Sequence, residues 1–221
     1  MDLLRAIRNL VTRTKANEPP GIKFNKADQT LQVKLVLVGD NGAGKPSLVW
    51  SLHRKAPYNG IEPLPFGSTN NEHYEVEVDT PRGHVCIDLW DTWAHVDYDQ
   101  IRAVTYQDMG IVAFVFGMDN ADTLSSIEER WLDEVNRCCL GVPSVVIGCK
   151  NDLPAEVNTE AVIGLATRIG ARHYIECSPQ KYVGIEEILE RVANLAWELH
   201  QKKKSQRRCE LSVTLPSEHE P

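Results

Sequence analysis

Residues 39–47 read Gly39-Asp40-Asn41-Gly42-Ala43-Gly44-Lys45-Pro46-Ser47. This stretch fits the phosphate-binding pattern G-x-x-x-x-G-K, in which glycines free the backbone N–H groups to wrap around phosphate oxygens and the lysine adds a positive charge. The apolar run at 33–38 and the helix-compatible run at 47–53 supply the strand and the helix that such a loop requires. The motif demands Ser or Thr after the lysine, and Pro46 stands there instead. The loop therefore predicts phosphate binding with one altered position.

Composition and charge favour a single soluble domain. The chain has 221 residues, of which 42% are apolar and 25% charged, so it can bury a sizeable core. Its longest apolar run near the middle, 111–116, is too short to cross a bilayer. The net charge of −7 argues against a nucleic-acid surface. The six cysteines show no metal-binding spacing and are expected to be reduced thiols of a cytosolic protein, with a disulfide framework as the alternative.

Strand and helix patterns alternate along the rest of the chain. The stretch 74–90 predicts a hairpin that turns at 81–83. Such alternation indicates an α/β fold with a six-stranded, mostly parallel sheet, helices on both faces and ligands at the carboxyl ends of the strands. We expect an extension and linker at 1–32, one domain at 33–201 and a tail at 202–221. Further strands are predicted at 111–116, 144–148 and 173–177, and helices at about 123–137, 159–169 and 184–201.

Three motifs at strand ends resemble those of a known family. Trp90-Asp91-Thr92, with the stretch 97–102 after it, resembles the switch II pattern W-D-T-A-G-Q-E-D-Y-D-x-L-R. Cys149-Lys150-Asn151-Asp152 resembles the base-reading motif N/T-K-x-D, and Glu176-Cys177-Ser178 resembles E-C-S-A. From about Val33 to Gln201 the chain thus resembles the Ras superfamily of small GTPases, most closely its Rho branch. The Rho insert helix expected after Asp152 is missing, so the resemblance is to an atypical member.

The resemblance implies a P-loop NTPase small G domain that binds GTP or GDP. Asp152 would accept hydrogen bonds from the guanine N1–H and 2-amino group, and Lys150 would pack its stem across the base. Asp91 would support Mg²⁺ through water. A solvated charge at a strand end is the alternative reading for each of the three. The other implied nucleotide contacts are Gly39, Asn41, Gly42, Ala43, Gly44, Lys45, Pro46, Ser47, Ala94, Ser178 and Pro179.

Six positions depart from the family pattern around the metal, the γ-phosphate and the base. Pro46 removes a hydroxyl ligand of Mg²⁺, and Ser47 would replace it only if the helix start shifted by one residue. His95 stands where a glutamine orients the attacking water, although a histidine can also hold a water. These changes predict weak or absent Mg²⁺ binding and impaired hydrolysis. The remaining departures are Asn41, Leu64, Ala94 and Pro179, with Ser68 and Thr69 as stand-ins for the threonine that Leu64 replaces.

Two hypotheses of function remain open. In the first, the protein is a Rho-like guanine-nucleotide switch with slow or absent hydrolysis. In the second, it is a pseudo-GTPase scaffold that binds protein partners without a nucleotide cycle. The resemblance implies effector and regulatory proteins as partners, bound through the switch regions.

The two ends of the chain are locally basic. The segment 3–13 places five apolar residues at helical spacing with three arginines between them, which fits a helix packed on the domain, a membrane-surface helix or an organelle presequence. The stretch 202–212 resembles the polybasic region and C-a-a-X box of Rho proteins, but nine residues follow Ser212. Cys209 is therefore not expected to be prenylated. We expect a cytoplasmic protein with weak peripheral membrane contact through its basic ends.

Overall fold

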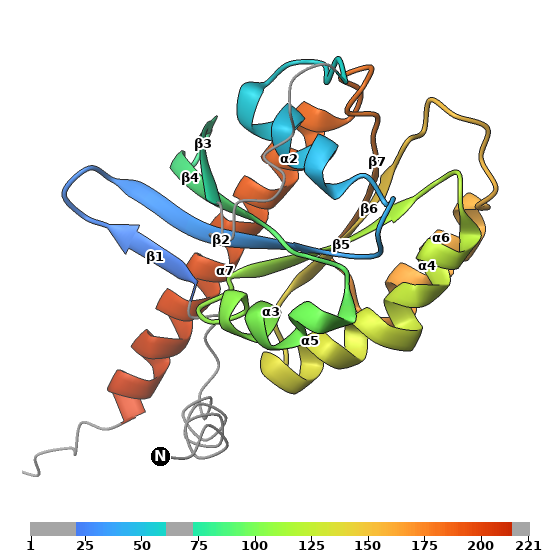
Figure 1. Cartoon of the computed structure of the whole chain (residues 1–221). Helices are drawn as coiled ribbons and strands as arrows, with labels where there is room; N and C mark the ends of the chain where they lie inside the picture. The colour runs from blue at the N-terminus through green and yellow to red at the C-terminus, as the bar shows by residue number, and fades with distance from the viewer. Residues whose placement is uncertain (1–20, 61–72, 214–221) are drawn as a thin grey trace, which may run out of the picture.

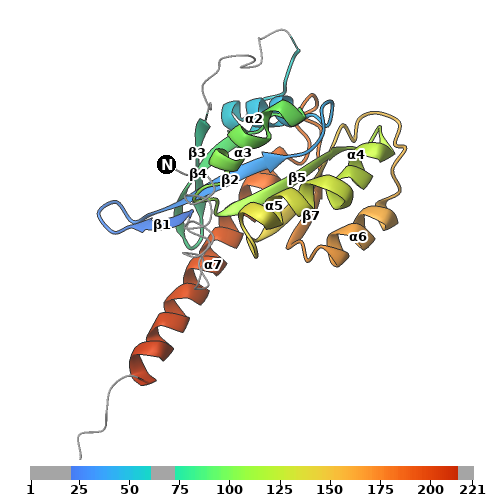
Figure 2. The ribbon, with the colours of Figure 1, turned by 60° about the horizontal axis from the view of Figure 1, so that its bottom comes forward.

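The computed structural model describes residues 21–60 and 73–213, and within them one twisted sheet carries helices on both faces (Figures 1 and 2). The strands follow the order β3-β4-β2-β5-β6-β7, and β1 pairs with β2. The strands are β1 (Ile22–Asn25), β2 (Thr30–Val38), β3 (His73–Thr80), β4 (Gly83–Asp91), β5 (Ile111–Gly117), β6 (Ser144–Cys149) and β7 (His173–Glu176). The helices are α2 (Lys45–Arg54), η1 (Val96–Tyr98), α3 (Asp99–Thr105), α4 (Ala121–Ser126), η2 (Ile127–Trp131), α5 (Leu132–Cys138), α6 (Thr159–Arg168) and α7 (Ile185–Val213).

The core has two layers because successive side chains of a strand point to opposite faces of the sheet. Leu35 and Leu37 of β2 pack with α2 and α7 on one face. Val36 and Val38 pack on the other face with the segment around α3 and with η2, α5 and α6. All residues of β5 are buried, as expected of a central strand covered on both sides. The predicted α/β fold with a mostly parallel sheet is confirmed.

The direction of the strands decides where the site lies. β4, β2, β5, β6 and β7 run parallel, so their carboxyl ends meet at one edge of the sheet. The phosphate loop follows β2, the switch II stretch follows β4, and the two base-reading motifs follow β6 and β7. The predicted hairpin is present as the antiparallel pair β3–β4, with Thr80 opposite Gly83 at its turn. Motifs that are far apart in the sequence thus lie along the same edge.

Several elements differ from those the sequence predicted. β1 is a seventh strand within the predicted extension, and η1 and α3 form a short helical segment after β4. The helix predicted at 123–137 is a continuous run of α4, η2 and α5, in which η2 is a π-helical turn. α7 continues to Val213, well past the expected end at Gln201. Between Asp152 and the start of α6 the chain forms turns and no helix.

Candidate functional site

The phosphate loop is a tight backbone turn between β2 and α2. Gly44 has a φ of 99°, a left-handed conformation that glycine adopts without strain. A Cβ on Gly39 would lie 2.0 Å from the carbonyl oxygen of Val115, so no other residue fits there. The N–H of Leu48 donates to the carbonyl of Gly44 at 2.9 Å and closes the first turn of the helix. The loop has the geometry that the glycine pattern predicted.

Lys45 is buried and turns its side chain back over the loop. Its ammonium nitrogen donates to the carbonyl oxygens of Gly39, at 2.6 Å, and Asp40, at 2.9 Å. Burial lowers the pKa of Lys45, and the carboxylates of Asp91 and Asp40 partly offset this effect. A phosphate oxygen beside this ammonium would supply the negative charge that a buried cation requires.

Pro46 is the second residue of α2, and the helix begins at Lys45. Its ring is accommodated because proline suits the first turn of a helix. At this position the chain offers neither a side-chain hydroxyl nor a backbone N–H. Ser47 is the third helical residue, so a ligand role for its hydroxyl requires a later helix start than the one present here.

Asp91 ends β4 and carries a buried acceptor atom. Its Oδ1 has no hydrogen-bond partner among the described residues. Burial raises the pKa of Asp91 to about 6, although Lys45 and the N–H of Thr92 act in the opposite direction. An unpaired buried carboxylate oxygen fits the water shell of a divalent cation. Asp91 would thus be able to support a hydrated cation, whereas Pro46 offers no side-chain ligand.

The raised pKa of Asp91 predicts a pH-dependent stability of the nucleotide-free protein. The folded pKa of about 6 lies above the unfolded value of 3.8, so stability is lost as pH rises between these values and is regained as pH falls. From pH 7 to pH 5 the gain should be on the order of 1 kcal/mol. Thermal unfolding of the wild type and of Asp91→Asn at both pH values measures it. All other groups are common to both proteins, so equal pH responses would contradict the assignment.

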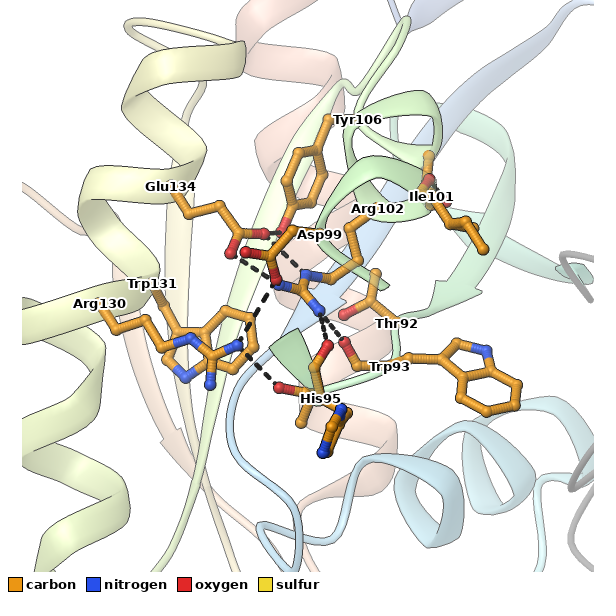
Figure 3. Close-up of polar contacts among 12 residues, drawn as sticks. Thr92, Trp93, His95, Asp99, Ile101, Arg102, Tyr106, Arg130, Trp131 and Glu134 are labelled. Carbon is orange, nitrogen blue, oxygen red and sulfur yellow. Dashed lines mark hydrogen bonds and ion pairs between the residues drawn. The ribbon is translucent and has the colours of Figure 1, made fainter. Parts of the chain in front are cut away.

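The switch II turn is held by two arginines at its backbone carbonyls (Figure 3). The guanidinium of Arg102 donates to the carbonyl oxygens of Trp93, at 2.6 Å, and His95, at 2.9 Å. Arg130 donates to the intervening carbonyl of Ala94 at 2.8 Å. Three successive peptide groups are therefore fixed at the positions where the family pattern reads A-G-Q.

Arg102 belongs to a buried ionic network between α3 and α5. Its side chain is 1% exposed and makes two hydrogen bonds to Glu134, at 2.7 and 2.8 Å, and an ion pair with Asp99. The hydroxyl of Tyr106 donates to the same carboxylate at 2.6 Å. Burial opposes ionisation of Glu134, but the hydrogen bonds from Arg102 and Tyr106 outweigh it and lower the pKa of Glu134. Sequence reasoning did not assign this network.

The side chain of His95 interacts with the nearby residue Asp97. Its Nδ1 accepts the N–H of Asp97 at 3.4 Å and lies 3.2 Å from the Asp97 carboxylate. The imidazole is 59% exposed. Trp93 is also exposed, and its ring packs against Tyr98 with centroids 4.4 Å apart. This arrangement shows no interaction between the His95 side chain and the phosphate loop.

The segment η2 connects switch II to the phosphate loop. The indole N–H of Trp131 donates to Oδ1 of Asp40 at 2.9 Å. The guanidinium of Arg130, which holds Ala94, lies 4.2 Å from the centre of the Trp131 ring. Because Arg130 and Trp131 are neighbours in the π turn, one helical segment contacts both parts of the site.

The base-reading motif lies at the ends of β5 and β6. The ammonium of Lys150 pairs with Asp119 at 2.9 Å, and Oδ1 of Asp119 is buried without a partner among the described residues. Asp152 is exposed, in a turn closed by the N–H of Leu153 donating to the Lys150 carbonyl at 3.1 Å. Lys150 and Asp152 therefore follow β6 at the same edge of the sheet as the phosphate loop. Asp119 is a residue that sequence reasoning missed.

The segment after β7 packs against α2. Ser178 is buried, and its hydroxyl accepts the N–H of Lys181 at 3.1 Å. The carbonyl of Pro179 accepts a hydrogen bond from the hydroxyl of Ser51 at 3.0 Å and from the N–H of Tyr58 at 2.9 Å. The carbonyl of Pro179 thus links this segment to α2. Its backbone nitrogen carries no hydrogen, so it cannot donate a hydrogen bond to a nucleotide base.

Cys149 occupies the first position of the base-reading motif, where the family pattern has Asn or Thr. Its thiol is buried and lies 3.6 Å from that of Cys177. A Cβ on Gly44 would lie 3.1 Å from the Cys149 Cβ, so the cysteine packs directly against the phosphate loop. The sequence motif already indicated this change, because a cysteine thiol cannot replace the hydrogen-bond donors and acceptors of an asparagine amide.

Most of the predicted site residues follow strands that end at one edge of the sheet. They are the phosphate loop, Asp91, switch II, Lys150 and Ser178. Leu64, Ser68 and Thr69 lie outside the described residues. Within those residues no group of three His, Cys, Asp or Glu side chains is arranged to hold a metal. A cation would therefore depend on water and on phosphate oxygens as well as on Asp91.

Comparisons with known proteins agree with this geometry. The Ras family profile matches residues 34–198. The GTP-binding protein RHO1 of Candida albicans is 32% identical over 193 residues, which cover 81% of this chain and 95% of the relative. The GTP-binding protein rho1 of Schizosaccharomyces pombe is 31% identical and covers 81% of this chain and 96% of the relative. The GTP-binding protein RHO1 of Saccharomyces cerevisiae is 32% identical over 175 residues.

Proposed function

The chain belongs to the Ras superfamily of small GTPases as a Rho-like member, and from this membership we propose that it binds GDP and GTP but hydrolyses GTP slowly or not at all. Nucleotide binding is supported by the intact cradle. The phosphate loop keeps its glycine geometry and Lys45, while Lys150 and Asp152 follow β6 at the same edge of the sheet. These contacts to the diphosphate and the base need no metal.

One observation carries the proposal of impaired hydrolysis. His95, at the position that orients water in the family, interacts with Asp97, and its carbonyl is held by Arg102. Positioning of the attacking water is a main protein contribution to phosphoryl transfer. The backbone N–H of Asp97 engages Nδ1 of His95, so only Nε2 is left to contact a water, whereas a glutamine amide offers both a donor and an acceptor.

Metal support is incomplete in the same region. When bound, Mg²⁺ would neutralise the charge that develops on the leaving diphosphate. Asp91 would hold it through water, whereas Pro46 supplies no ligand. We therefore propose that nucleotide affinity depends little on Mg²⁺.

Titration with a fluorescent GDP analogue, with and without Mg²⁺, tests the proposal. We expect saturable binding in both conditions, with affinities that differ by less than about tenfold, which corresponds to about 1.4 kcal/mol. Absence of saturable binding at high micromolar protein would reject nucleotide binding.

Restoring the threonine isolates the role of the loop. In Pro46→Thr, Mg²⁺ should strengthen GDP binding by about ten- to a hundredfold, the size of effect known for changes near a metal ligand. Ser47→Ala is the matched control, because its hydroxyl lies one helical position further on and should not alter the metal response. An unchanged metal response in Pro46→Thr would show that the loop was misinterpreted.

A nucleotide-independent scaffold remains the second candidate function. It is favoured by the switch II turn, where the carbonyl oxygens of three successive residues accept hydrogen bonds from Arg102 and Arg130. Single-turnover hydrolysis separates the candidates, because a rate similar to that of ordinary small GTPases would exclude a pure scaffold. In both cases we propose effector and regulatory proteins as partners of the switch surface.

We propose a cytoplasmic location with weak peripheral membrane contact. Lys202, Lys203 and Lys204 lie on α7 beyond its packed part, and an anionic leaflet attracts each such cation by about 1 kcal/mol. Among the described residues, no helix is both long enough and apolar enough to span a bilayer.

A further inference from the structure

An apolar ridge runs along the segment after β4. Ile101 and Val104, one turn apart on α3, are 48% and 55% exposed. Val96 is 58% exposed and Trp93 is 41% exposed. These four, the α3 ridge, are half of the eight large apolar side chains exposed in the described part of the chain. Figure 3 shows Trp93 and Ile101 on the side of α3 away from Glu134.

An acidic surface lies on the neighbouring part of the sheet. Glu75, Glu77 and Asp79 alternate along β3, share one face and are exposed. Asp88 of β4 lies opposite Glu75 on the same face. We call these four residues the acidic sheet face. Basic residues are its natural complement.

The chain enters the domain between this face and the end of α3. The N–H of Lys34 donates to the carbonyl of Gly21 at 3.0 Å. A Cβ on Gly21 would lie 1.9 Å from the carbonyl oxygen of Asp108, in the turn that follows α3. Lys34 lies opposite Asp88 in the register of β2 and β4, and its ammonium donates to the carbonyl of Gln107 at 3.0 Å. Gly21, the first residue that the structure describes, therefore lies next to both surfaces.

The sequence of that segment matches both surfaces in chemistry. Its apolar residues are Leu3, Leu4, Ile7, Leu10 and Val11, and its arginines are Arg5, Arg8 and Arg13. We propose that residues 2–13 dock on the α3 ridge of their own chain, with their apolar side against Ile101 and Val104 and their arginines toward the acidic sheet face. The segment then covers the switch II surface and competes with any protein that binds there.

The length of the segment is compatible with this site. Twelve residues in a helix span about 18 Å, and α3, with seven residues, spans about 10 Å. The connection 14–20 reaches up to about 24 Å when extended. A tether this short gives an effective concentration in the millimolar range, so a segment whose separate peptide binds with a Kd near 0.1 mM would be about nine-tenths docked within the chain.

Hydrogen exchange of the full chain and of a chain lacking residues 2–16 tests the proposal. We expect amides of 96–106 to exchange at least threefold more slowly in the full chain. A synthetic peptide of residues 1–16 should restore the slow exchange when it is added to the shortened chain. Equal exchange in the two chains would overturn the proposal.

Matched variants identify the contact. Ile101→Asp with Val104→Asp should remove the protection, whereas Ile163→Asp on α6, at a residue that is 53% exposed, should keep it. Arg5→Glu, Arg8→Glu and Arg13→Glu together should also remove it, and they leave the folded domain unaltered. If the peptide binds phosphatidylserine vesicles but leaves exchange of 96–106 unchanged, the segment is a membrane helix and the proposal is wrong.

Discussion

Replacing Glu134 with alanine is expected to lower the free energy of unfolding by about 3–5 kcal/mol, because it leaves a buried guanidinium with only the half-exposed carboxylate of Asp99 as counter-ion. Arg102 is 1% exposed and makes its two shortest charged contacts to α5 through this carboxylate. The hydroxyl of Tyr106 loses its acceptor as well. For a domain of this size each kcal/mol lowers Tm by about 2–4 °C, so thermal unfolding should fall by about 6–20 °C.

An exposed pair of the same geometry provides the control. Arg168 binds both carboxylate oxygens of Glu128, at 3.1 and 2.9 Å, and both side chains are largely exposed. Glu128→Ala should therefore change the unfolding temperature very little, because solvent screens an exposed ion pair. Limited proteolysis of switch II supplies a second measurement, because Glu134→Ala should also loosen the carbonyl contacts of Arg102. If the two variants unfolded at the same temperature, the buried network would not determine stability.

The acid side of the pH profile follows from the same network. Glu134 has a folded pKa below its usual value of 4.5, so its contribution is complete above that pH and is lost as pH falls through the folded pKa. Asp91 acts in the opposite direction, because its folded pKa is raised. Stability should thus be greatest in mildly acid solution and fall again below about pH 4.

The sequence predicted the fold well because its signals are local. The glycine loop, the apolar runs and the alternating hairpin each decide a conformation within about ten residues, and parallel strands then bring their carboxyl ends together. This reasoning predicted that the motifs after β4, β6 and β7 lie at the same edge of the sheet. Agreement between local pattern and overall topology is expected of a sequence that folds to one structure.

The contacts that hold the site were not predictable in the same way. Arg102 and Glu134 are 32 residues apart, and Lys150 and Asp119 are 31 apart, so no periodicity relates them. Each contact forms only because the fold packs two separate elements side by side, so it cannot be predicted from the sequence pattern of either element alone. β1 was missed because its four residues, Ile22–Asn25, lie inside a segment whose composition suggested a linker.

Replacing Asp152 with alanine should lower GDP affinity by about 10²- to 10⁴-fold, because guanine loses two hydrogen bonds to a charged acceptor, each of about 1.5–3 kcal/mol. The position of the carboxylate is well defined. The N–H of Asn151 donates to the carbonyl of Cys177 at 3.2 Å, and Leu153 closes the turn on Lys150 at 3.1 Å. The backbone at Asp152 is therefore held between the ends of β6 and β7, and the residue is exposed to solvent.

Inosine diphosphate identifies the contact at the level of single atoms. It lacks the 2-amino group, so the wild type should prefer GDP by about 10- to 150-fold, the value of one such hydrogen bond, whereas Asp152→Ala should bind both equally. Glu156→Ala is the control, because this exposed acid lies in the same loop and only its backbone N–H is engaged, with the carbonyl of Met118 at 2.9 Å. Titration of the three proteins with both nucleotides decides the matter. If Asp152→Ala kept the preference for GDP, the base would be recognised elsewhere, and Asp152 would be only a solvated charge at the end of a strand.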